Sequence, residues 1–255
     1  MDVFITGGSR GIGREIVLRF AREGWGVAFS YAGNEAAAAE TIRLAEAAAK
    51  EAENETVRNG GKIKGYTMDA RNRADIERVT EAVLADFNDV HALVNNAAIL
   101  RNNAALLMSD EEWDDVLAAN LTAPFLLMRG FTMHFISQRH GRIVNISSLA
   151  EGGCSGQANY AASKAGLTGL TLTFAKEYGP KNITANIVTV GYVPTDMTKD
   201  HMADDLHQYW MKHCPLKRPG KGDEIADLVH FLCSERGRFI NGERIRVSGG
   251  LTYAP

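Results

Sequence analysis

Short apolar runs alternate with longer helix-compatible segments along the chain, and this alternation restricts its fold more than any other feature. The runs are brief and almost continuously apolar, which is typical of strands covered on both faces of a sheet. We predict strands at residues 3–5, 27–29, 63–66, 92–94, 143–146, 187–190 and 245–247. We predict helices at residues 12–23, 34–57, 74–87, 110–138, 158–178 and 223–234.

A chain in which strands and helices alternate forms right-handed βαβ units, with helices on both faces of a parallel sheet. The seven predicted strands use all 255 residues, and no Pro- or Ser-rich linker divides them. We therefore predict an α/β fold: a single doubly wound, Rossmann-type domain over residues 1–255, built on a seven-stranded parallel sheet.

The charge balance and the cysteines exclude several classes of protein. The chain has 28 Lys and Arg against 31 Asp and Glu, a net charge of −3, so it lacks the basic field of a nucleic-acid or membrane-surface binder. Cys154, Cys214 and Cys233 have no metal-ligand spacing, and an odd number of cysteines suits a reducing compartment. No uninterrupted apolar run of 18 residues is present and no secretory signal is visible. We expect a cytoplasmic protein with no metal and no membrane span.

A glycine-rich turn follows the first predicted strand directly. Gly7, Gly11 and Gly13 are spaced G-x3-G-x-G, and an amphipathic helical segment begins at once. A turn without side chains lets a helix N-terminus approach a pyrophosphate, which its free N–H groups and dipole attract. This position, at the start of a βαβ series, predicts a dinucleotide site.

The end of the second strand indicates which dinucleotide binds. An NAD site usually places a carboxylate there for the ribose 2′-hydroxyl, whereas this chain has Ser30 and Tyr31. Arg10, in the glycine turn, is suited to meet a 2′-phosphate. We therefore predict NADP(H) as the cofactor in preference to NAD(H).

A second group of residues suits proton transfer. Tyr160 and Lys164 are four residues apart on a predicted helix and so share one face. A nearby ammonium lowers the pKa of a phenol, which makes this pair a candidate general acid for a carbonyl oxygen or base for an alcohol. The strand at residues 143–146 leads into Ser147 and Ser148, whose hydroxyls belong at the carboxyl edge of the sheet, where ligands bind.

These motifs together resemble the short-chain dehydrogenase/reductase family over essentially the whole chain. Residues 6–13 match the family's TGxxxGxG turn, and residues 95–98 (NNAA) resemble its NNAG motif. The family's catalytic tetrad falls on Asn120, Ser148, Tyr160 and Lys164.

The resemblance implies a role for each member of the tetrad. Tyr160 would transfer the proton, and Ser148 would polarise the substrate oxygen. Lys164 would lower the pKa of Tyr160 and bind the nicotinamide ribose. Asn120 would hold a water that relays protons from Lys164 to solvent.

The resemblance also extends the predicted cofactor site. It implies that Asp69 and Ala70 meet the adenine, that Asn95 stabilises the central strand, and that residues 190–195 form the segment that meets the carboxamide and pyrophosphate. The predicted cofactor-binding set is Gly7, Ser9, Arg10, Gly11, Ile12, Gly13, Ser30, Tyr31, Asp69, Ala70, Asn96, Ala97, Tyr160, Lys164, Gly191, Val193 and Thr195.

The chain departs from the family pattern at four places. Ala98 replaces the last glycine of NNAG, and Val190 replaces the proline before Gly191. The loop before Tyr160 is about one residue short, so counting back from Tyr160 favours Ser147, whereas aligning the strand favours Ser148, which we choose. The segment 34–58 is about a dozen residues longer than usual, for no purpose that the sequence reveals.

Within the family, residues 139–144, 156–160 and 242–250 most resemble the 3-oxoacyl-(acyl-carrier-protein) reductases. This resemblance implies NADPH-dependent reduction of a β-ketoacyl or polyketide-type ketone to a secondary alcohol. The alternatives are an alcohol, sugar or steroid dehydrogenase of the same family and, more remotely, a non-catalytic dinucleotide-binding sensor or scaffold.

The resemblance implies partners as well as a substrate. An acidic acyl carrier protein would dock on a basic patch near the site entrance, for which Arg139 and Lys181 are the candidates. A lid at about residues 192–215, rich in Met, His and aromatic residues, would cover the substrate. The assembly implied is a homotetramer.

Overall fold

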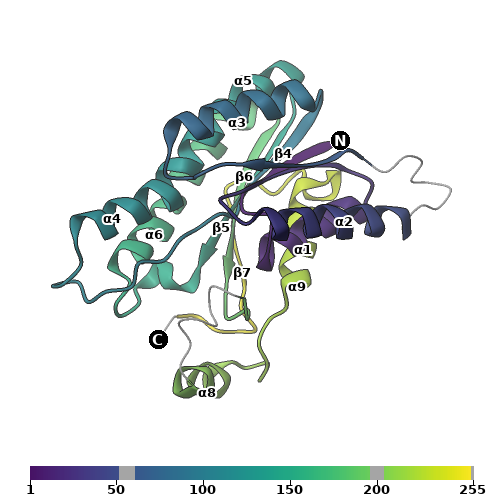
Figure 1. Ribbon diagram of the computed structural model, residues 1–255. Helices are drawn as coiled ribbons and strands as arrows, with labels where there is room; N and C mark the ends of the chain where they lie inside the picture. Colours follow the sequence, from purple (N-terminus) through teal and green to yellow (C-terminus); the bar gives the residue numbers. More distant parts are fainter. Residues whose placement is uncertain (52–60, 196–203, 254–255) are drawn as a thin grey trace.

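All seven strands of the computed structural model form one parallel sheet in the order β3-β2-β1-β4-β5-β6-β7 (Figure 1). The structure describes residues 1–51, 61–195 and 204–253, with only the backbone described at 204–207. The strands are β1 (Asp2–Ile5), β2 (Gly26–Tyr31), β3 (Ile63–Thr67), β4 (Val90–Asn95), β5 (Gly141–Ser148), β6 (Ile183–Val190) and β7 (Arg244–Val247). The predicted fold class is thus confirmed, and each predicted strand is present.

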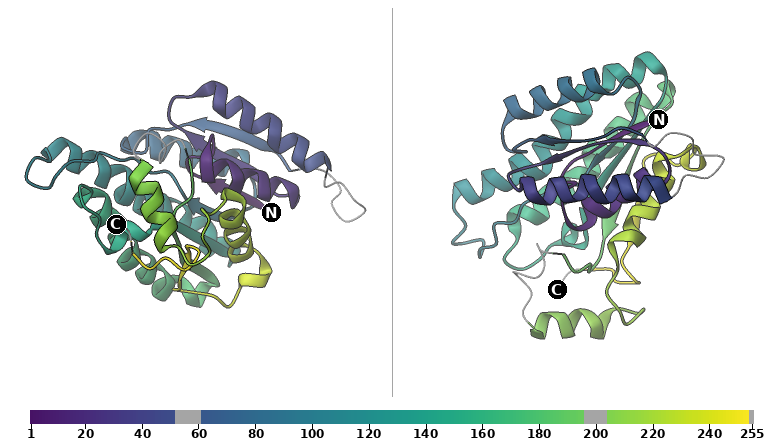
Figure 2. Two further views of the ribbon diagram at one scale, coloured as in Figure 1. Left: turned by 90° about the horizontal axis from the view of Figure 1, so that it is seen from below. Right: turned by 45° about the vertical axis from the view of Figure 1, so that its right-hand side comes forward.

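Helices cover both faces of the sheet. They are α1 (Gly11–Arg22), α2 (Glu35–Glu51), α3 (Arg73–Asp86), α4 (Asp110–Leu117), α5 (Ala123–Gln138), α6 (Ala158–Tyr178), α8 (Asp204–His213) and α9 (Gly222–Cys233). In Figure 2, α1 and α2 lie on the opposite side of the strands from α3 and α5. Successive side chains of a strand point to opposite faces, so one strand contributes to both cores. Val3 and Ile5 of β1 pack in the core between the sheet and helices α1 and α9, while Phe4 packs in the core between the sheet and helices α3 and α5.

Two helical predictions differ from the structure. The predicted helix 34–57 is described only as α2, which ends at Glu51, and its remainder lies outside the described residues. The predicted helix 110–138 contains a π-helical turn, η1 (Ala118–Thr122), between α4 and α5. In addition, α8 lies within the predicted lid and was not predicted as a helix.

The stretch Asp110–Gln138 is long and apolar enough to cross a membrane, with a mean hydropathy of 1.3 over its best window. This was not predicted, because polar residues interrupt the run. Of that window, 56% is buried inside the protein. Leu127, Phe131 and Phe135 of α5 belong to the core under the sheet, as expected for a core helix.

A buried polar chain ties the central strands to α6. The Nδ2 of Asn95, on β4, donates to Oδ1 of Asn145, on β5, at 2.8 Å. Asn145 in turn donates to Oγ1 of Thr171, on α6, at 2.8 Å. Buried amides that are paired in this way stabilise one arrangement of strands and helix. The end of β5 and the α6 face that carries Tyr160 are therefore held in register.

Candidate active site

A cleft of about 360 Å³ lies at the carboxyl edge of the sheet. Every residue of the predicted cofactor-binding set lines it, and so do both Ser147 and Ser148. Val190, from the predicted segment 190–195, also lines it, and so do residues that were not predicted: Ala32, Gly33, Asn34, Met68, Ala98, Ile99, Ala119 and Ile146. Most of these flank predicted residues directly, so extending each motif by a few positions is the signal that would have found them.

The glycine turn is built to approach a ligand closely. Gly7 and Gly11 have positive φ angles of 69° and 54°, a conformation that side chains disfavour. A Cβ on Gly13 would overlap the carbonyl oxygen of Gly7. The first turn of α1 holds no acidic residue, and the N-cap residue Arg10 makes no side-chain cap. The N–H groups at this helix end are thus left for an anion, and the turn fits the pyrophosphate of a dinucleotide.

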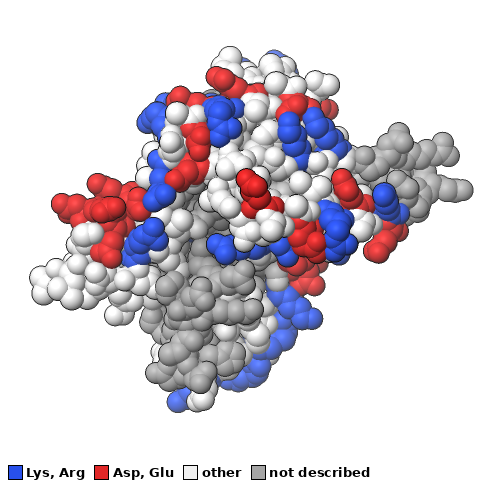
Figure 3. Space-filling model, viewed as in Figure 1, with Lys and Arg blue, Asp and Glu red and all other residues white. Residues whose placement is uncertain are grey.

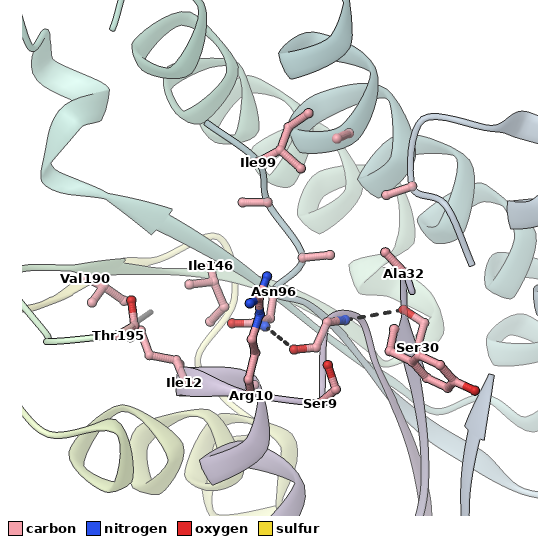
Figure 4. A pocket seen from close by; sticks show the side chains of 18 of the residues that line it. Ser9, Arg10, Ile12, Ser30, Ala32, Asn96, Ile99, Ile146, Val190 and Thr195 are labelled. Carbon is pink, nitrogen blue, oxygen red and sulfur yellow. Dashed lines mark hydrogen bonds between the residues drawn. The ribbon is translucent and has the colours of Figure 1, made fainter. Parts of the chain in front are cut away.

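Two neighbouring strands hold the turn in place (Figure 4). From β2, the hydroxyl of Ser30 accepts a hydrogen bond from the backbone N of Gly7 at 3.3 Å. From the segment after β4, Nδ2 of Asn96 donates to the carbonyl oxygen of Gly7 at 3.2 Å, as Figure 4 shows, and to that of Thr6 at 3.0 Å. The shape of the turn therefore depends on residues far from it in the sequence.

The cleft-lining residues at the end of β2 include no carboxylate of their own, and Arg10 supplies a cation to the same cleft. Ser30 is buried against the turn, and Tyr31, Ala32, Gly33 and Asn34 continue the cleft wall. Arg10 is exposed and has no side-chain hydrogen bond or ion pair within residues 1–51, 61–195 and 204–253. It is available to a negatively charged ligand group.

Asp69 lines the cleft as predicted, but its carboxylate is already paired. Arg71 donates to both of its oxygens, and this hydrogen bonding lowers the pKa of Asp69. Arg71 also bonds Asp115 of α4 at 3.0 Å. The aspartate is thus held ionised at the cleft wall beside Ala70.

Tyr160 and Lys164 are on one face of α6 and line the cleft together. Nζ of Lys164 lies 5.6 Å from the centre of the Tyr160 ring and donates to the carbonyl oxygen of Ile146 at 2.8 Å. Burial raises the pKa of Tyr160 to about 12, although a hydrogen bond with Ser148 acts in the opposite direction. Burial lowers the pKa of Lys164 to about 8, against the attraction of Glu151.

The net shift of Tyr160 is opposite to the one predicted from the nearby ammonium. The removal of the phenol from water outweighs the interactions that favour the phenolate. Tyr160 is therefore protonated at neutral pH, which suits a group that donates a proton to a carbonyl oxygen.

The two serines at the end of β5 have different partners. The Ser148 side chain shares a hydrogen bond with Tyr160 and accepts one from the backbone N of Ala150 at 3.2 Å. The hydroxyl of Ser147 donates to Glu151 at 2.7 Å and to the carbonyl oxygen of Lys164 at 3.3 Å. Ser148 is thus the serine beside the phenol, and Ser147 is turned toward a carboxylate.

Asn120 does not line the cleft. It lies in the π-helical turn η1, where its Oδ1 accepts from the backbone N of Ile99 at 2.9 Å and its Nδ2 donates to the carbonyl oxygen of Ile99 at 3.0 Å. A further bond, at 3.3 Å, reaches Ser163 of α6. Asn120 therefore joins the cleft-lining segment at Ile99 to the helix that carries Tyr160. Such π-turns are frequent at functional sites.

The described part of the predicted lid packs on the C-terminal segment. The rings of Tyr192 and Trp210 stack with 5.8 Å between their centres, and Leu149, Cys214 and Leu251 form a small core beside them. The predicted lid residues Met197, His201 and Met202 lie outside the described residues, as does the side chain of His207.

The predicted docking patch is not at the entrance of this cleft, so that prediction is wrong. Arg139 precedes β5 and Lys181 precedes β6, and Asn182 donates to the carbonyl oxygen of Arg139 at 3.0 Å. Both cations therefore lie at the amino edge of the sheet. The cleft is at the other end of β5, roughly 23 Å away for eight residues of strand. Figure 3 shows charges of both signs interspersed on the visible face, with acidic side chains gathered over α4.

A family model described as Enoyl-(Acyl carrier protein) reductase matches residues 7–252, and the chain belongs to the short-chain dehydrogenase/reductase family. It is accordingly an oxidoreductase that uses a nicotinamide dinucleotide and acts on CH–OH or C=O groups.

Relatives and solved structures agree with this membership. The 3-oxoacyl-(acyl-carrier-protein) reductase FabG of Staphylococcus epidermidis is 38% identical over 253 residues, 98% of each chain. FabG of Escherichia coli is also 38% identical, over 97% of this chain and 95% of its own. A mutant short-chain dehydrogenase/reductase of Serratia marcescens superposes with a TM-score of 0.87 at 32% identity, covering 98% and 97% of the two chains. A blue fluorescent protein from a metagenomic library, in complex with NADPH, gives 0.86 at 30% identity, covering 98% and 96%.

Proposed function

We propose that this protein uses NADPH to reduce a β-ketoacyl or polyketide-type ketone to a secondary alcohol. The observation that carries the proposal is the placement of Tyr160, Lys164 and Ser148 in the same cleft as the glycine turn. The full-length identity of 38% to 3-oxoacyl-(acyl-carrier-protein) reductases supports the substrate class.

In this proposal the cofactor supplies the hydride, and the protein controls the proton. Tyr160 donates its proton to the ketone oxygen, to which Ser148 also donates a hydrogen bond. Lys164 stabilises the phenolate that Tyr160 becomes and binds the ribose hydroxyls. The contacts of Asn120 with Ile99 and Ser163 support a role beside the cleft, with the relay water as its predicted ligand.

The preference for NADP(H) over NAD(H) rests on the end of β2. β2 ends in Ser30 and Tyr31, so the strand itself supplies no carboxylate to accept from a ribose 2′-hydroxyl or to repel a 2′-phosphate, and the Ser30 hydroxyl is engaged with Gly7. The exposed guanidinium of Arg10 supplies a positive charge at the cleft. The NADPH complex of a similar structure agrees with this choice.

We propose that the substrate is either free or bound to a carrier. The chain forms one domain over residues 1–255, in which a lid at about residues 192–215 covers the substrate. A homotetramer is supported by exposed apolar side chains on α5 and α6, namely Phe125, Met133 and Leu172. A cytoplasmic location stays a prediction.

The decisive test is an assay of NADPH and NADH oxidation with a panel of ketones and alcohols, including a β-keto ester and carrier-bound acyl chains. We expect β-keto substrates to be reduced, with a KM for NADPH at least about tenfold below that for NADH, as one charge-assisted contact can provide. Turnover of alcohols alone would favour the alcohol, sugar or steroid dehydrogenase. Tight cofactor binding without any turnover would favour the sensor or scaffold.

Alanine substitutions distinguish the two serines. We expect Ser148→Ala to lower kcat by about 10²-fold, because it removes a donor to the substrate oxygen. Ser147→Ala removes a hydrogen bond to Glu151 and should lower kcat far less. Steady-state kinetics with a β-keto ester measure both variants. A larger loss in Ser147→Ala would reverse the assignment.

A further inference from the structure

Glu151 is hydrogen-bonded to Ser147, a residue of the cleft wall, although no motif pointed to Glu151. It belongs to the short 3-10 helix η2 (Leu149–Gly152), and its side chain is only 10% exposed. Three elements bring it partners. Ser147 of β5 donates to Oε2 at 2.7 Å, Thr189 of β6 donates to Oε1 at 3.3 Å, and Arg244 of β7 donates to Oε1 at 3.2 Å.

This cluster reaches Lys164 by two routes. The hydroxyl of Ser147 bonds both Glu151 and the carbonyl oxygen of Lys164, on the helix that carries Tyr160. The Nζ of Lys164 is held by the carbonyl oxygen of Ile146, the residue before Ser147. A buried ammonium with one neutral acceptor is costly to keep charged, and a carboxylate nearby offsets that cost.

We propose that Glu151 is a positioning residue for proton transfer: with Ser147 it fixes the end of β5 against α6, and its carboxylate keeps the buried Lys164 in its ammonium form, with Arg244 moderating that charge. The proposal rests on the proposed function, because the ammonium matters only where Tyr160 gives up a proton. It adds a residue from outside the cleft to the reaction.

Few charged or titratable groups of the described residues face Glu151 and Lys164. Within the described residues, Glu151 is the charged group that raises the pKa of Lys164, against burial. Arg244 faces Glu151 from β7, Tyr160 lies beside Lys164 on α6, and Cys154 acts on Tyr160 from the loop. The ammonium is required for reduction, so we expect activity to fall as pH rises through the pKa of Lys164.

The test compares the pH profiles of wild type and Glu151→Gln. Glutamine keeps one oxygen acceptor for Ser147 and removes the negative charge, and its NH2 group takes the position of the oxygen that accepts from Thr189 and Arg244. The alkaline limb of kcat should therefore move to lower pH by about 0.5 to 1 unit. The limb is measured for NADPH oxidation with a β-keto ester from about pH 6 to about pH 10. A Glu151→Gln profile that superposes on that of the wild type, with an unchanged melting temperature, overturns the proposal.

Arg244→Gln is the matched variant, and it is expected to shift the alkaline limb of kcat in the opposite direction. Its side chain is 51% exposed, so the protein should fold normally. Without the positive charge of Arg244, the negative charge of Glu151 stabilises the Lys164 ammonium more strongly. The alkaline limb of kcat should therefore move to higher pH. A limb that stays in place or moves to lower pH contradicts the proposal, even if Glu151→Gln does not fold.

A second readout separates this inference from the proposed function. In protein labelled with ¹³C at Lys Cε, the resonance assigned by its loss in Lys164→Arg reports the titration of Lys164 without any turnover. A lower midpoint in Glu151→Gln supports the role of Glu151 even if the wild type reduces no ketone, in which case the proposed function alone fails. An unchanged midpoint removes the role of Glu151 even if ketone reduction is active.

Discussion

The Tyr160→Phe variant is expected to lose about 10³-fold in kcat for ketone reduction, while its affinity for NADPH stays within about twofold of the wild type. The substitution removes one oxygen from a ring that stays in place beside Lys164. In the proposed function, the lost oxygen carries the proton for the substrate, and it also interacts with Ser148. Stopped-flow NADPH oxidation measures the rate, and cofactor fluorescence measures the binding.

Tyr178→Phe is the matched control for this experiment. Tyr178 is on the same helix, and its ring packs against Phe174 at 5.2 Å between centres, outside the cleft lining. Its kcat should equal that of the wild type. If Tyr160→Phe kept more than about a tenth of wild-type turnover, the phenol would not be the proton donor.

The second large effect is expected from Gly13→Ala. The added methyl group would overlap the carbonyl oxygen of Gly7 and lie 2.6 Å from Nδ2 of Asn96, so the turn must open or the helix must shift. We expect NADPH affinity to fall by at least about 10²-fold, and the free energy of unfolding to drop by about 2 kcal/mol, as in other overpacked sites. Fluorescence titration and urea unfolding measure the two effects.

Gly169→Ala tests whether any Gly-to-Ala change in a helix has this effect. Gly169 lies in α6, and a Cβ there would meet nothing within 4 Å. This variant should bind NADPH normally and be up to about 1 kcal/mol more stable, because alanine restricts the unfolded chain. Normal NADPH binding by Gly13→Ala would show that the turn does not need the close approach of α1.

Local sequence patterns were sufficient to predict the strands of the sheet and most of the residues that line the cleft. The inner strands could be predicted because they are short apolar runs buried on both faces, as Val27–Phe29 within β2 illustrates, whereas the edge strands β3 and β7 are more exposed. The pairing of Tyr160 with Lys164 follows from the period of one helix. The glycine turn could be located because its position after β1 is set by neighbours in the sequence.

Features that depend on partners distant in the sequence were missed. Arg244 reaches Glu151 across 93 positions, so no local motif contains the pair. The net pKa shift of Tyr160 depends on how completely the fold removes the phenol from water, which residue spacing does not report. Arg139 was assigned to the wrong end of the sheet because charge alone carries no information about which edge a residue occupies.

The sequence by itself determined the α/β architecture, the glycine turn and the placement of Tyr160 beside Lys164, because periodicity, glycine spacing and i,i+4 placement act over a few residues. The tertiary structure alone decided which serine lies beside Tyr160 and at which edge of the sheet Arg139 and Lys181 lie. It also decided that Ser147 links Glu151 to the backbone of Lys164. Hydrogen bonds, burial and Coulomb interactions depend on distances in space, and only the folded sheet brings β5, β6, β7 and α6 together.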